Sequence, residues 1–554
     1  MHDIEAAWGN SGVLAFPIDI SAVLAHMHQD MRDDWFFDPI QHQDLFANQK
    51  SLKEVVTELL LEGNGRYLGS IRQVYDIPKK GLGIRYSLET DFYDRFVYQA
   101  VCSYLIPFFD PILSPRVLGH RYNKRRKEEK YLFKNRIELW RTFEGVTYTA
   151  LRNDQALLAT DLINYFENIS VELIQRCFET ALSTLEATGP EKLKIRNAIQ
   201  TLCELLTRWG YSSRHGLPQN RDASSFIANV VLNSVDHKMC SMNYDYFRYV
   251  DDIRIICKSA PEAKRALIDL IAELRTVGMN INSAKTKILT STSSESEIAD
   301  FFPNSDDRSV TIDNMWRSRS RRTIARSATY IFQLLEECIA KKETQSRQFR
   351  FAVNRLCRLA DAKLFDIQSP IAAQLVELIL ESLEDHPAST DQYCRLLSML
   401  NPPTDALDRI ERYLRDHSRS IHSWQNYHLW FVIAKRRHKT EELVELANLR
   451  ITNQLLAPEV PAIFVYLSCV GESARLAPLV ERFSTSWPYY HQRCFLLATS
   501  DLDRADLKPL VEKLGPKVRN TVHRALPYFK AGKPIAEPER SSVINLYDDI
   551  SPYD

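Results

Sequence analysis

Two adjacent aspartates, Asp251 and Asp252, constrain the fold more than any other feature of this sequence. They stand inside Tyr246–Cys257, a segment rich in apolar and β-branched residues. After the pair, apolar residues alternate with charged ones such as Arg254, which is the period of a half-buried strand. The segment therefore predicts two strands joined by a turn that presents both carboxylates. On its own, such a pair is most often only a solvated hairpin turn.

A third carboxylate favours a chemical site over a solvated turn. Asp161 follows the short apolar run Ala156–Thr160 and precedes a helix start. A carboxylate at the end of a buried strand is costly unless it binds a partner. Three carboxylates from adjacent strands suit two hard cations about 3.5–4 Å apart, which activate a hydroxyl and stabilise a pentavalent phosphate. We therefore predict a Mg²⁺ site, with Mn²⁺ as an alternative, made by Asp161, Asp251 and Asp252.

Other motifs lie before and after these aspartates, and together they resemble the reverse transcriptase family in content and order. The resemblance covers roughly residues 35 to 290. It implies an α+β right-hand polymerase with fingers and palm, and RNA-directed DNA polymerase activity on dNTPs with DNA or RNA as the nucleic-acid partner. The matching segments are Ile77–Arg85 (fingers motif), Asp161 (motif A), Gly216–Asp236 (motif B), Tyr249–Asp252 (the Y-x-D-D motif) and Gly278–Ile288 (motif D).

The resemblance also implies roles for single residues around the metal site. Asp161 and Asp251 would hold both metals, and Asp252 would complete the acidic cluster. The backbone carbonyl of Leu162 would supply a further oxygen ligand. Phe166 would block a ribose 2′-hydroxyl and so select deoxynucleotides, with core packing as the alternative role for its ring.

Basic residues in two of the motifs would bind the phosphates. Lys80 and Arg85 of the fingers would grip the incoming triphosphate, the arginine as a planar fork and the lysine as a point charge. Lys79 is an alternative to Lys80. Lys285 of motif D would be a catalytic residue that neutralises or protonates the leaving pyrophosphate. Without the motif context, each lysine would be expected on a solvated surface.

Motif B departs from the family pattern. Pro218 and Gln219 match the loop beneath the nascent base pair, so Gln219 is a predicted substrate-binding residue. Template-copying members usually carry a small residue after the glutamine, whereas Asn220, Arg221 and Asp222 follow here. We therefore expect a charged pair near the template strand, and template handling that differs from the usual pattern.

The C-terminal part of the sequence is helical. From about Ala325 to Lys530, helical runs of roughly ten to eighteen residues are separated by Pro, Gly or Ser. Their lengths vary and no signature repeats, so a HEAT-like helical repeat and a plain helical bundle both stay open. We predict fingers and palm over 1–310, a thumb-like helical connection over 311–365, an all-α repeat domain over 366–535 and a flexible tail over 536–554.

This arrangement resembles the bacterial abortive-infection and defence-associated reverse transcriptases, in which an α-helical repeat domain follows the polymerase. The resemblance implies antiphage defence and DNA synthesis without a conventional template, sometimes primed from a protein hydroxyl. Tyr547 and Tyr553 are candidate priming residues, although ordinary tail residues are the simpler interpretation. Two alternatives stay open: a retron- or intron-like enzyme that copies a dedicated non-coding RNA, and a non-catalytic scaffold with a polymerase fold.

Net charge does not indicate a partner, because 71 Lys and Arg balance 71 Asp and Glu. Locally, however, Arg116–Arg152 carries eleven Lys or Arg against four Glu, with rings such as Tyr131, Phe133 and Trp140 interleaved. Charge for phosphates and rings for bases is typical of a single-strand track. Arg317–Arg326 forms a second basic cluster. A solvated helix face is the alternative for each cluster.

Cysteine spacing and hydropathy indicate the cellular compartment in which the protein works. The ten cysteines are scattered without a C-x-x-C pair, which favours reduced thiols in a cytoplasmic protein. No stretch reaches the roughly 18 apolar residues of a membrane span, and the first residues lack a basic, apolar leader. We expect a soluble protein without a membrane partner, and a homo-oligomer remains an open alternative.

Overall fold

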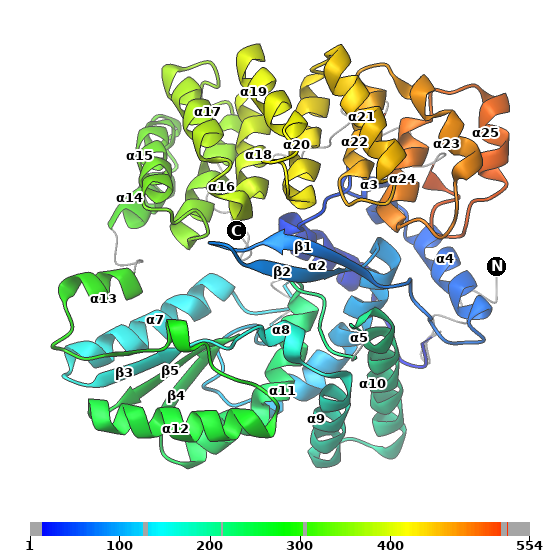
Figure 1. Cartoon of the computed structure of the whole chain (residues 1–554). Helices are drawn as coiled ribbons and strands as arrows, with labels where there is room; N and C mark the ends of the chain where they lie inside the picture. Colours follow the sequence, from blue (N-terminus) through cyan, green and yellow to red (C-terminus); the bar gives the residue numbers. More distant parts are fainter. Residues whose placement is uncertain (1–13, 126–130, 212–213, 303–306, 522–528, 530–554) are drawn as a thin grey trace.

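The two halves of the chain lie on opposite sides of a β-hairpin (Figure 1). This computed structural model describes residues 14–125, 131–211, 214–302, 307–521 and 529. The first half combines helices with a small sheet, and the described residues after 307 form helices and connecting loops without a strand. This is the order of an α+β unit followed by an all-α unit that the sequence predicted.

A four-stranded antiparallel sheet organises the first half. Its strands are β3 (Ala156–Thr160), β4 (Asp245–Tyr249), β5 (Asp252–Cys257) and β6 (Lys287–Leu289), in the order β4-β5-β3-β6. Every residue of β3 is buried, because this apolar strand has a neighbour on each side. The predicted strand–turn–strand arrangement around Asp251 and Asp252 is therefore β4, a two-residue turn and β5.

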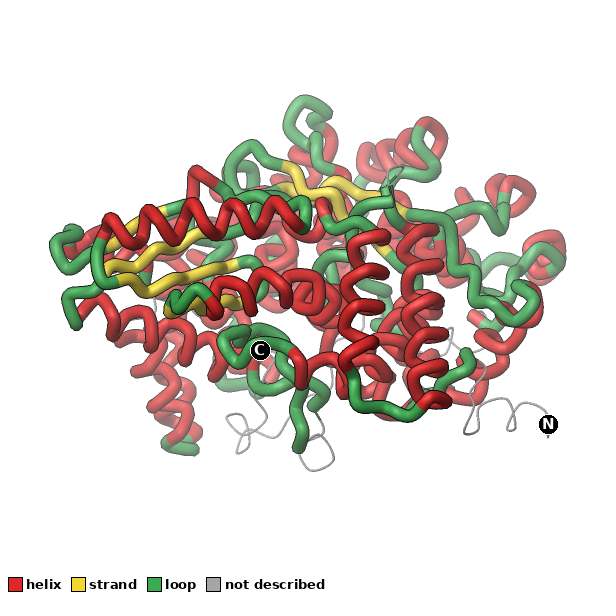
Figure 2. The backbone as a smooth tube through the Cα atoms, turned by 90° about the horizontal axis from the view of Figure 1, so that it is seen from below, coloured by secondary structure: helices red, strands yellow, loops and turns green. Residues whose placement is uncertain are grey.

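Helices cover both faces of this sheet (Figure 2). Helix α7 (Arg136–Arg152) packs on one face, where Leu157 meets Phe143 in a small apolar cluster. Helices α11 (Asp222–Ser241) and α12 (Ala260–Thr276) pack on the other face, which belongs to the main core. Successive strand residues point to opposite faces, so a continuously apolar strand can pack against the helices on both faces.

The other helices of the first half extend the main core around the sheet. Helix α5 packs against α2, α10 and α11, and α9 packs against α10 and α11. Their bounds are α2 (Ile20–Asp30), α3 (Gln43–Phe46), α4 (Gln49–Glu62), α5 (Phe92–Phe109), α8 (Tyr165–Asn168), α9 (Val171–Thr184), α10 (Gly189–Trp209) and α13 (Glu295–Phe301).

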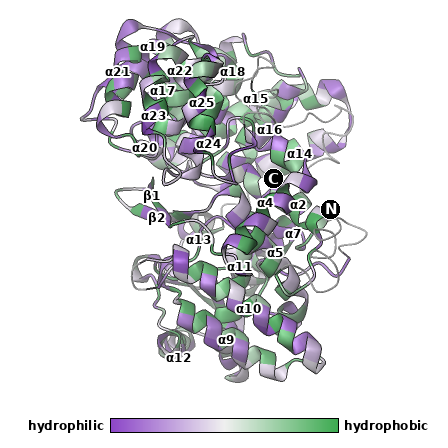
Figure 3. Cartoon of the chain, turned by 90° about the vertical axis from the view of Figure 1, so that its right-hand side faces the viewer, coloured by the Kyte–Doolittle hydropathy of each residue, from purple (hydrophilic) through white to green (hydrophobic). Residues whose placement is uncertain are grey.

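A separate hairpin stands between the sheet and the C-terminal helices (Figure 3). It consists of β1 (Gln73–Pro78) and β2 (Ile84–Glu89), which pair antiparallel so that Ile77 faces Arg85. The fingers motif Ile77–Arg85 therefore forms the end of β1, the tip of the hairpin and the first two residues of β2. The hairpin contacts α20 of the C-terminal half.

The C-terminal helices form a two-row array. One row contains α15, α17, α19 and α21, the other contains α16, α18, α20, α22 and α24, and each helix contacts its neighbours within and across the rows. Their bounds are α14 (Asp307–Arg317), α15 (Arg321–Ala340), α16 (Arg347–Asp361), α17 (Pro370–Ser382), α18 (Thr390–Leu400), α19 (Thr404–Arg415), α20 (Ser423–Arg436), α21 (Glu441–Asn453), α22 (Val460–Cys469), α23 (Pro478–Arg482), α24 (Tyr489–Ala498) and α25 (Arg504–Val511).

The predicted domain limits fall at different kinds of position. The limit after residue 310 lies inside α14, and the limit after residue 365 lies in the loop between α16 and α17. The HEAT-like character of the array stays a prediction. Tyr547, Tyr553 and the predicted tail lie outside the described residues. Among the residues that the structure describes, no helix is long and apolar enough to span a membrane.

The array docks on the N-terminal segment through α20. The indole Nε1 of Trp424 donates a hydrogen bond to the carbonyl of Trp35 at 2.8 Å, and the hydroxyl of Tyr427 donates to the carbonyl of Phe37 at 2.5 Å. The ring of Phe37 also packs on Phe431, with centroids 4.6 Å apart. Apolar packing and satisfied carbonyls together bind the two halves to one another.

A buried guanidinium makes a second attachment. Arg493 of α24 is fully buried and pairs with Asp38 and with Asp44, the latter at 2.6 Å from Nη2 to Oδ1. Nearer the C-terminus, the Nζ of Lys517 lies 2.8 Å from Asp94 Oδ1. Separating such a pair leaves an uncompensated buried charge, so undocking of the array is costly.

Candidate active site

The three predicted metal-binding carboxylates lie together at one end of the sheet. Asp251 occupies the turn between β4 and β5, and Asp252 is the first residue of β5. Thr160 of β3 pairs with Ile253 of β5. Because the two strands are antiparallel, Asp161, which follows Thr160, lies beside Asp252, which precedes Ile253. The sheet register therefore gathers side chains from two separate motifs.

The electrostatics of these carboxylates suit cations. Burial, and then the charge of Asp161, raise the pKa of Asp251. Burial, and then the charge of Asp251, raise the pKa of Asp252 to about 7. Oδ1 of Asp161 is buried and has no hydrogen-bond partner. Mutually repelling carboxylates with an unpartnered oxygen fit hard cations such as Mg²⁺.

Lys285 lies against the same carboxylates. It ends the short 3₁₀ helix η3 (Ser283–Lys285), and its Nζ is 2.5 Å from Oδ2 of Asp161. Partial burial lowers the pKa of Lys285, but the hydrogen bond to Asp161 and the charges of Asp251 and Asp252 raise it by more. The lysine therefore stays an ammonium beside the acidic cluster.

A buried arginine, which the sequence interpretation missed, supports the turn that carries Asp251. Val250 has a φ of 57°, a conformation that a β-branched residue rarely adopts. Arg248 donates to the carbonyl of Val250 at 2.8 Å and to Asn229 at 2.9 Å, and it pairs with Asp236 at 2.6 Å. A charged residue in the middle of an apolar strand was the available signal, because it needs an opposite charge when buried.

Glycine allows a close approach of the chain to this turn. A Cβ atom built on Gly119 would lie 3.0 Å from both the backbone nitrogen and the Cγ2 of Val250. The carbonyl of Gly119 also accepts a hydrogen bond from Asn229 at 2.8 Å. The segment before α7 is thus packed directly against the turn that carries Asp251.

The two fingers lysines point to different places. Nζ of Lys79 donates to Oδ1 of Asn164 at 3.3 Å, so this side chain reaches from the hairpin to the loop after Asp161. Lys80 is exposed. Burial of His386 in the C-terminal half lowers the pKa of that histidine, and the charge of Lys80 lowers it further. The structure therefore places Lys79, the alternative from the sequence, nearer to the carboxylates.

Arg85 is the second residue of β2 in the hairpin, and its side chain is largely buried. Its guanidinium stacks over Trp35, 5.2 Å from the ring centroid. Burial and the charge of Arg350 lower the pKa of Arg85, while Asp251 opposes this shift. The charge of Asp251 thus acts on the guanidinium, as expected of a cation that faces the acidic cluster.

The residues predicted to contact the nucleotide sugar and base lie in motifs A and B, and one of them, Gln219, contacts the hairpin's second strand. Phe166 is half-buried in α8 and accepts a hydrogen bond on its carbonyl from Leu217 at 2.9 Å. Gln219 is buried, and its Nε2 donates to the carbonyl of Tyr86 at 3.1 Å. The side chain of Leu162 is also buried. These contacts join motif A, motif B and the fingers hairpin in one place.

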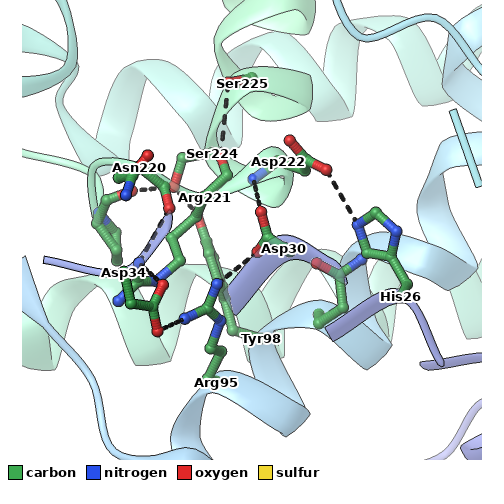
Figure 4. A network of polar contacts seen from close by, with 12 residues as sticks. His26, Asp30, Asp34, Arg95, Tyr98, Asn220, Arg221, Asp222, Ser224 and Ser225 are labelled. Atoms are coloured by element: carbon green, nitrogen blue, oxygen red, sulfur yellow. Dashed lines mark hydrogen bonds and ion pairs between the residues drawn. The ribbon is translucent and has the colours of Figure 1, made fainter. Parts of the chain in front are cut away.

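The charged pair of motif B does not face a template. Arg221 is 4% exposed, and it pairs with Asp34 at 3.0 Å and with Glu89 at 2.9 Å. Asp222 is equally buried and lies 2.9 Å from Nε2 of His120. Figure 4 shows both residues inside a network that connects motif B to the N-terminal helix α2. The expectation of a charged pair at the template strand is therefore wrong, because the N-terminal segment supplies buried partners.

Part of the basic segment Arg116–Arg152 is internal. Arg121 pairs with the buried Asp110 at 2.9 Å, and Phe133 is buried in the core. Residues 126–130 lie outside the described residues. Trp140 is half-buried and borders an open cavity of about 550 Å³ next to the carboxylates. This segment therefore contributes an aromatic ring to the cavity beside the carboxylates.

A comparison with protein families identifies the first half. Residues 77–351 match the family model described as "Reverse transcriptase (RNA-dependent DNA polymerase)". The chain carries a reverse transcriptase domain. The match begins in the fingers hairpin and ends in α16, so this domain extends into the first helices of the array. It indicates an enzyme of the RNA-directed DNA polymerase, or nucleotidyltransferase, class.

Two solved structures are similar to this chain at low identity. One is apo telomerase from Candida tropicalis, truncated from its C-terminal domain, at 12% identity and a TM-score of 0.29; the match covers 44% of this chain and 55% of that chain. The other is telomerase from Candida albicans with a fragment of telomeric RNA, at 10% identity and a TM-score of 0.29; it covers 68% of this chain and 64% of that chain. This chain thus covers less than two thirds of each. No curated protein matches the chain.

Proposed function

We propose that the chain is a DNA polymerase that joins deoxynucleotides to a growing strand by two-metal nucleotidyl transfer. The observation that carries this proposal is the convergence of Asp161, Asp251 and Asp252, with Oδ1 of Asp161 left unpartnered. Asp161, Asp251 and the carbonyl of Leu162 would hold Mg²⁺ or Mn²⁺, and Asp252 would complete the cluster. Arg85, beside Asp251, would bind the triphosphate.

The reaction balances without a further reactant. The 3′ oxygen of the strand forms a bond to the α-phosphorus of the dNTP, the bond from that phosphorus to the bridging oxygen breaks, and pyrophosphate leaves. The hydroxyl proton passes to water. Bound metal would acidify the hydroxyl and offset the phosphate charge. Lys285, whose pKa is raised, carries a proton that it can donate to pyrophosphate as it leaves.

The resemblance to defence-associated enzymes supports a narrower role. We propose that the C-terminal array is a HEAT-like repeat and that the enzyme protects bacteria against phage, with synthesis that is template-independent or protein-primed. The two-row packing of the array is consistent with a repeat. Arg321, Arg322 and Arg326 are exposed on α15, where they would contact DNA or RNA.

A second candidate is a retron- or intron-like enzyme that copies a dedicated non-coding RNA. One observation favours it. Arg221 and Asp222 were the residues that argued against ordinary template handling, and both are buried in internal ion pairs. Because both side chains are buried, the sequence of motif B is no longer an argument against the copying of a template.

Incorporation of labelled dNTPs by the full chain tests both candidates. Each dNTP is supplied with Mg²⁺ or Mn²⁺, with and without an annealed primer and template, and products are resolved before and after protease digestion. Product that forms without template and is released by protease supports the protein-primed role. Product that needs primer and template supports the copying role. Absence of product with every substrate contradicts both and leaves the non-catalytic scaffold.

A further inference from the structure

A histidine and two carboxylates meet in the C-terminal array, on the far side of the hairpin from the palm sheet (Figure 1). Asp408 and Glu411 lie about one turn apart on α19, and His438 lies in the loop between α20 and α21. One oxygen of each carboxylate and one ring nitrogen of the histidine all lie within 4.8 Å of one another. Three atoms of the kinds that bind metals therefore converge from two separate segments.

The distances at the histidine match those between ligands of one cation. Nε2 of His438 lies 3.4 Å from Oδ1 of Asp408 and 3.2 Å from Oε2 of Glu411. A ring nitrogen carries at most one hydrogen, so it can donate to only one of these carboxylates. Tetrahedral zinc, with bonds of about 2.0–2.2 Å, places neighbouring ligand atoms about 3.3–3.6 Å apart. Both measured separations are close to this value.

Burial and charge at the cluster suit a divalent ion. The side chains of Glu411 and His438 are 7% and 8% exposed, whereas that of Asp408 is 52% exposed. Two carboxylates repel one another where water is scarce, and a divalent ion offsets both charges. A ring nitrogen with two carboxylate oxygens suits Zn²⁺, whereas Mg²⁺ and Ca²⁺ take mainly oxygen ligands. The exposed Asp408 leaves a path for the ion to enter.

Neighbouring side chains hold Glu411 in a fixed orientation. The hydroxyl of Thr440 donates to Oε2 of Glu411 at 2.9 Å, and Nη1 of Arg415 lies 3.4 Å from Oε1. Thr440 is also the N-cap of α21, where its hydroxyl accepts from the amide of Leu443 at 3.1 Å. Carboxylates that bind metals normally accept such supporting hydrogen bonds. Contacts from α19 and from the start of α21 thus orient one carboxylate toward His438.

A buried tyrosine gives a second and independent indication of a ligand. Tyr466 of α22 is fully buried, and its hydroxyl has no hydrogen-bond partner among the described residues. Burial, and then the charge of Glu411, raise the pKa of Tyr466, so this hydroxyl lies in the field of that carboxylate. A buried hydroxyl without a partner is costly. A water bound to a metal beside Glu411 would supply the missing partner.

We infer that Asp408, Glu411 and His438 bind one Zn²⁺ ion, with a water at the fourth position that contacts the hydroxyl of Tyr466. The ion fastens the loop after α20 to α19. Helix α20 is the element that docks the array on the N-terminal segment, so the ion stabilises the docked array. The site is separate from the palm carboxylates, and the inference does not rest on the proposed polymerase function.

Titration of the full chain with ZnCl₂ tests the site without using catalysis. The Asp251→Asn, Asp252→Asn double variant in excess Mg²⁺ serves as the background, so that the palm carboxylates do not compete for the ion. Calorimetry should show one Zn²⁺ per chain. Asp408→Asn and His438→Asn should each weaken binding at least about 100-fold, because loss of even a supporting residue costs about 10–100-fold.

Two features make this titration decisive. Asp408 is exposed, so Asp408→Asn does not depend on refolding around a buried position. His417→Asn is the matched control, because His417 is an exposed histidine of the same array outside the cluster, and it should leave the affinity unchanged. Absence of Zn²⁺ binding, or equal binding by the background and by Asp408→Asn, would overturn the inference.

Tyr466→Phe tests the proposed water. The phenylalanine keeps the buried ring and removes only the hydroxyl, so the melting temperature of the metal-free chain should not fall. Zn²⁺ affinity should nevertheless fall about tenfold, which a purely structural role of the tyrosine would not produce. An unchanged affinity would remove Tyr466 from the site.

Thermal unfolding tests the consequence for the array. ZnCl₂ in excess should raise the melting temperature of the wild-type chain, because an ion that binds only the folded state stabilises it. The rise should be lost in Asp408→Asn and kept in His417→Asn. A rise of the same size in Asp408→Asn would place the stabilising ion elsewhere and overturn the assignment. Nucleotide incorporation is not used as a readout, so failure of the polymerase proposal would leave this result unaffected.

Discussion

Nζ of Lys285 lies 2.5 Å from Oδ2 of Asp161, while Oδ1 of the same aspartate is buried and has no partner. One carboxylate thus has one oxygen paired with a fixed cation and one oxygen available for a metal. This arrangement keeps an ammonium group, a proton donor, within reach of the proposed metal site. It makes the carboxylates the most sensitive targets for substitution.

Replacement of Asp251 and Asp252 together by asparagine should lower nucleotide incorporation by more than about 100-fold, because the amides cannot hold two hard cations. Asp154→Asn is the control. Asp154 is exposed just before β3 and has a φ of 57°, which asparagine also tolerates. Gel-resolved incorporation at saturating dNTP measures both. Persistent incorporation by the double variant would remove the metal assignment.

Lys79→Ala should raise the KM for dNTPs about tenfold, and Lys80→Ala should change it much less. The reason is that Lys79 reaches Asn164 beside the acidic cluster, whereas Lys80 is exposed and acts on His386. A charge-assisted contact is worth about 1.5–3 kcal/mol. Equal effects of the two substitutions would show that the hairpin moves when the nucleotide binds.

Phe166→Ala should increase ribonucleotide use relative to deoxynucleotide use by at least about tenfold, if the ring excludes a 2′-hydroxyl. Phe166→Leu is the matched variant, because leucine retains bulk in this half-buried position. The ratio of kcat/KM for rUTP and dTTP measures the effect. An unchanged ratio in the alanine variant would reduce Phe166 to a packing residue.

Arg221→Ala should lower the free energy of unfolding by about 3–5 kcal/mol, because it leaves Asp34 and Glu89 as buried charges without their partner. Denaturant unfolding followed by fluorescence measures it. Arg482→Ala, at an exposed position, should stay within about 0.5 kcal/mol of the wild type. A stable Arg221→Ala variant would return Arg221 to the list of template-contact candidates.

Acid should loosen the docking of the array through His42. This side chain is buried near Tyr489 of α24, and burial lowers its pKa to about 4 although Asp38 opposes the shift. The pKa of His42 is about 4 in the folded chain and about 6.5 in the unfolded chain, so the neutral imidazole stabilises the fold above pH 6.5. This stability, at most about 3 kcal/mol, is lost as the pH falls through about 4. His42→Asn should therefore show a smaller loss of stability between pH 6.5 and 4, measured by thermal unfolding across that range. An unchanged pH dependence would contradict this role.

Local patterns in the sequence were sufficient to predict β3, the β4–β5 hairpin with its turn, and the helical character of the C-terminal half. The alternation around Asp251 predicted the β4–β5 hairpin, and the apolar run before Asp161 predicted β3, because side-chain period decides which face a strand buries. The order of the motifs likewise predicted the reverse transcriptase domain, which the family match confirms. The change to helical runs predicted the all-α half.

Only the tertiary structure decided which of these residues meet. The burial of Arg221 depends on Asp34 from the N-terminal segment, and the stacking of Arg347 on Trp140 joins α16 to α7. Such contacts join segments that are distant in the chain, and they form only where packing offsets the entropy of closing the loop between them. The spacing of apolar and polar residues shows which side chains must be buried or paired. It does not show which distant residue will make the contact.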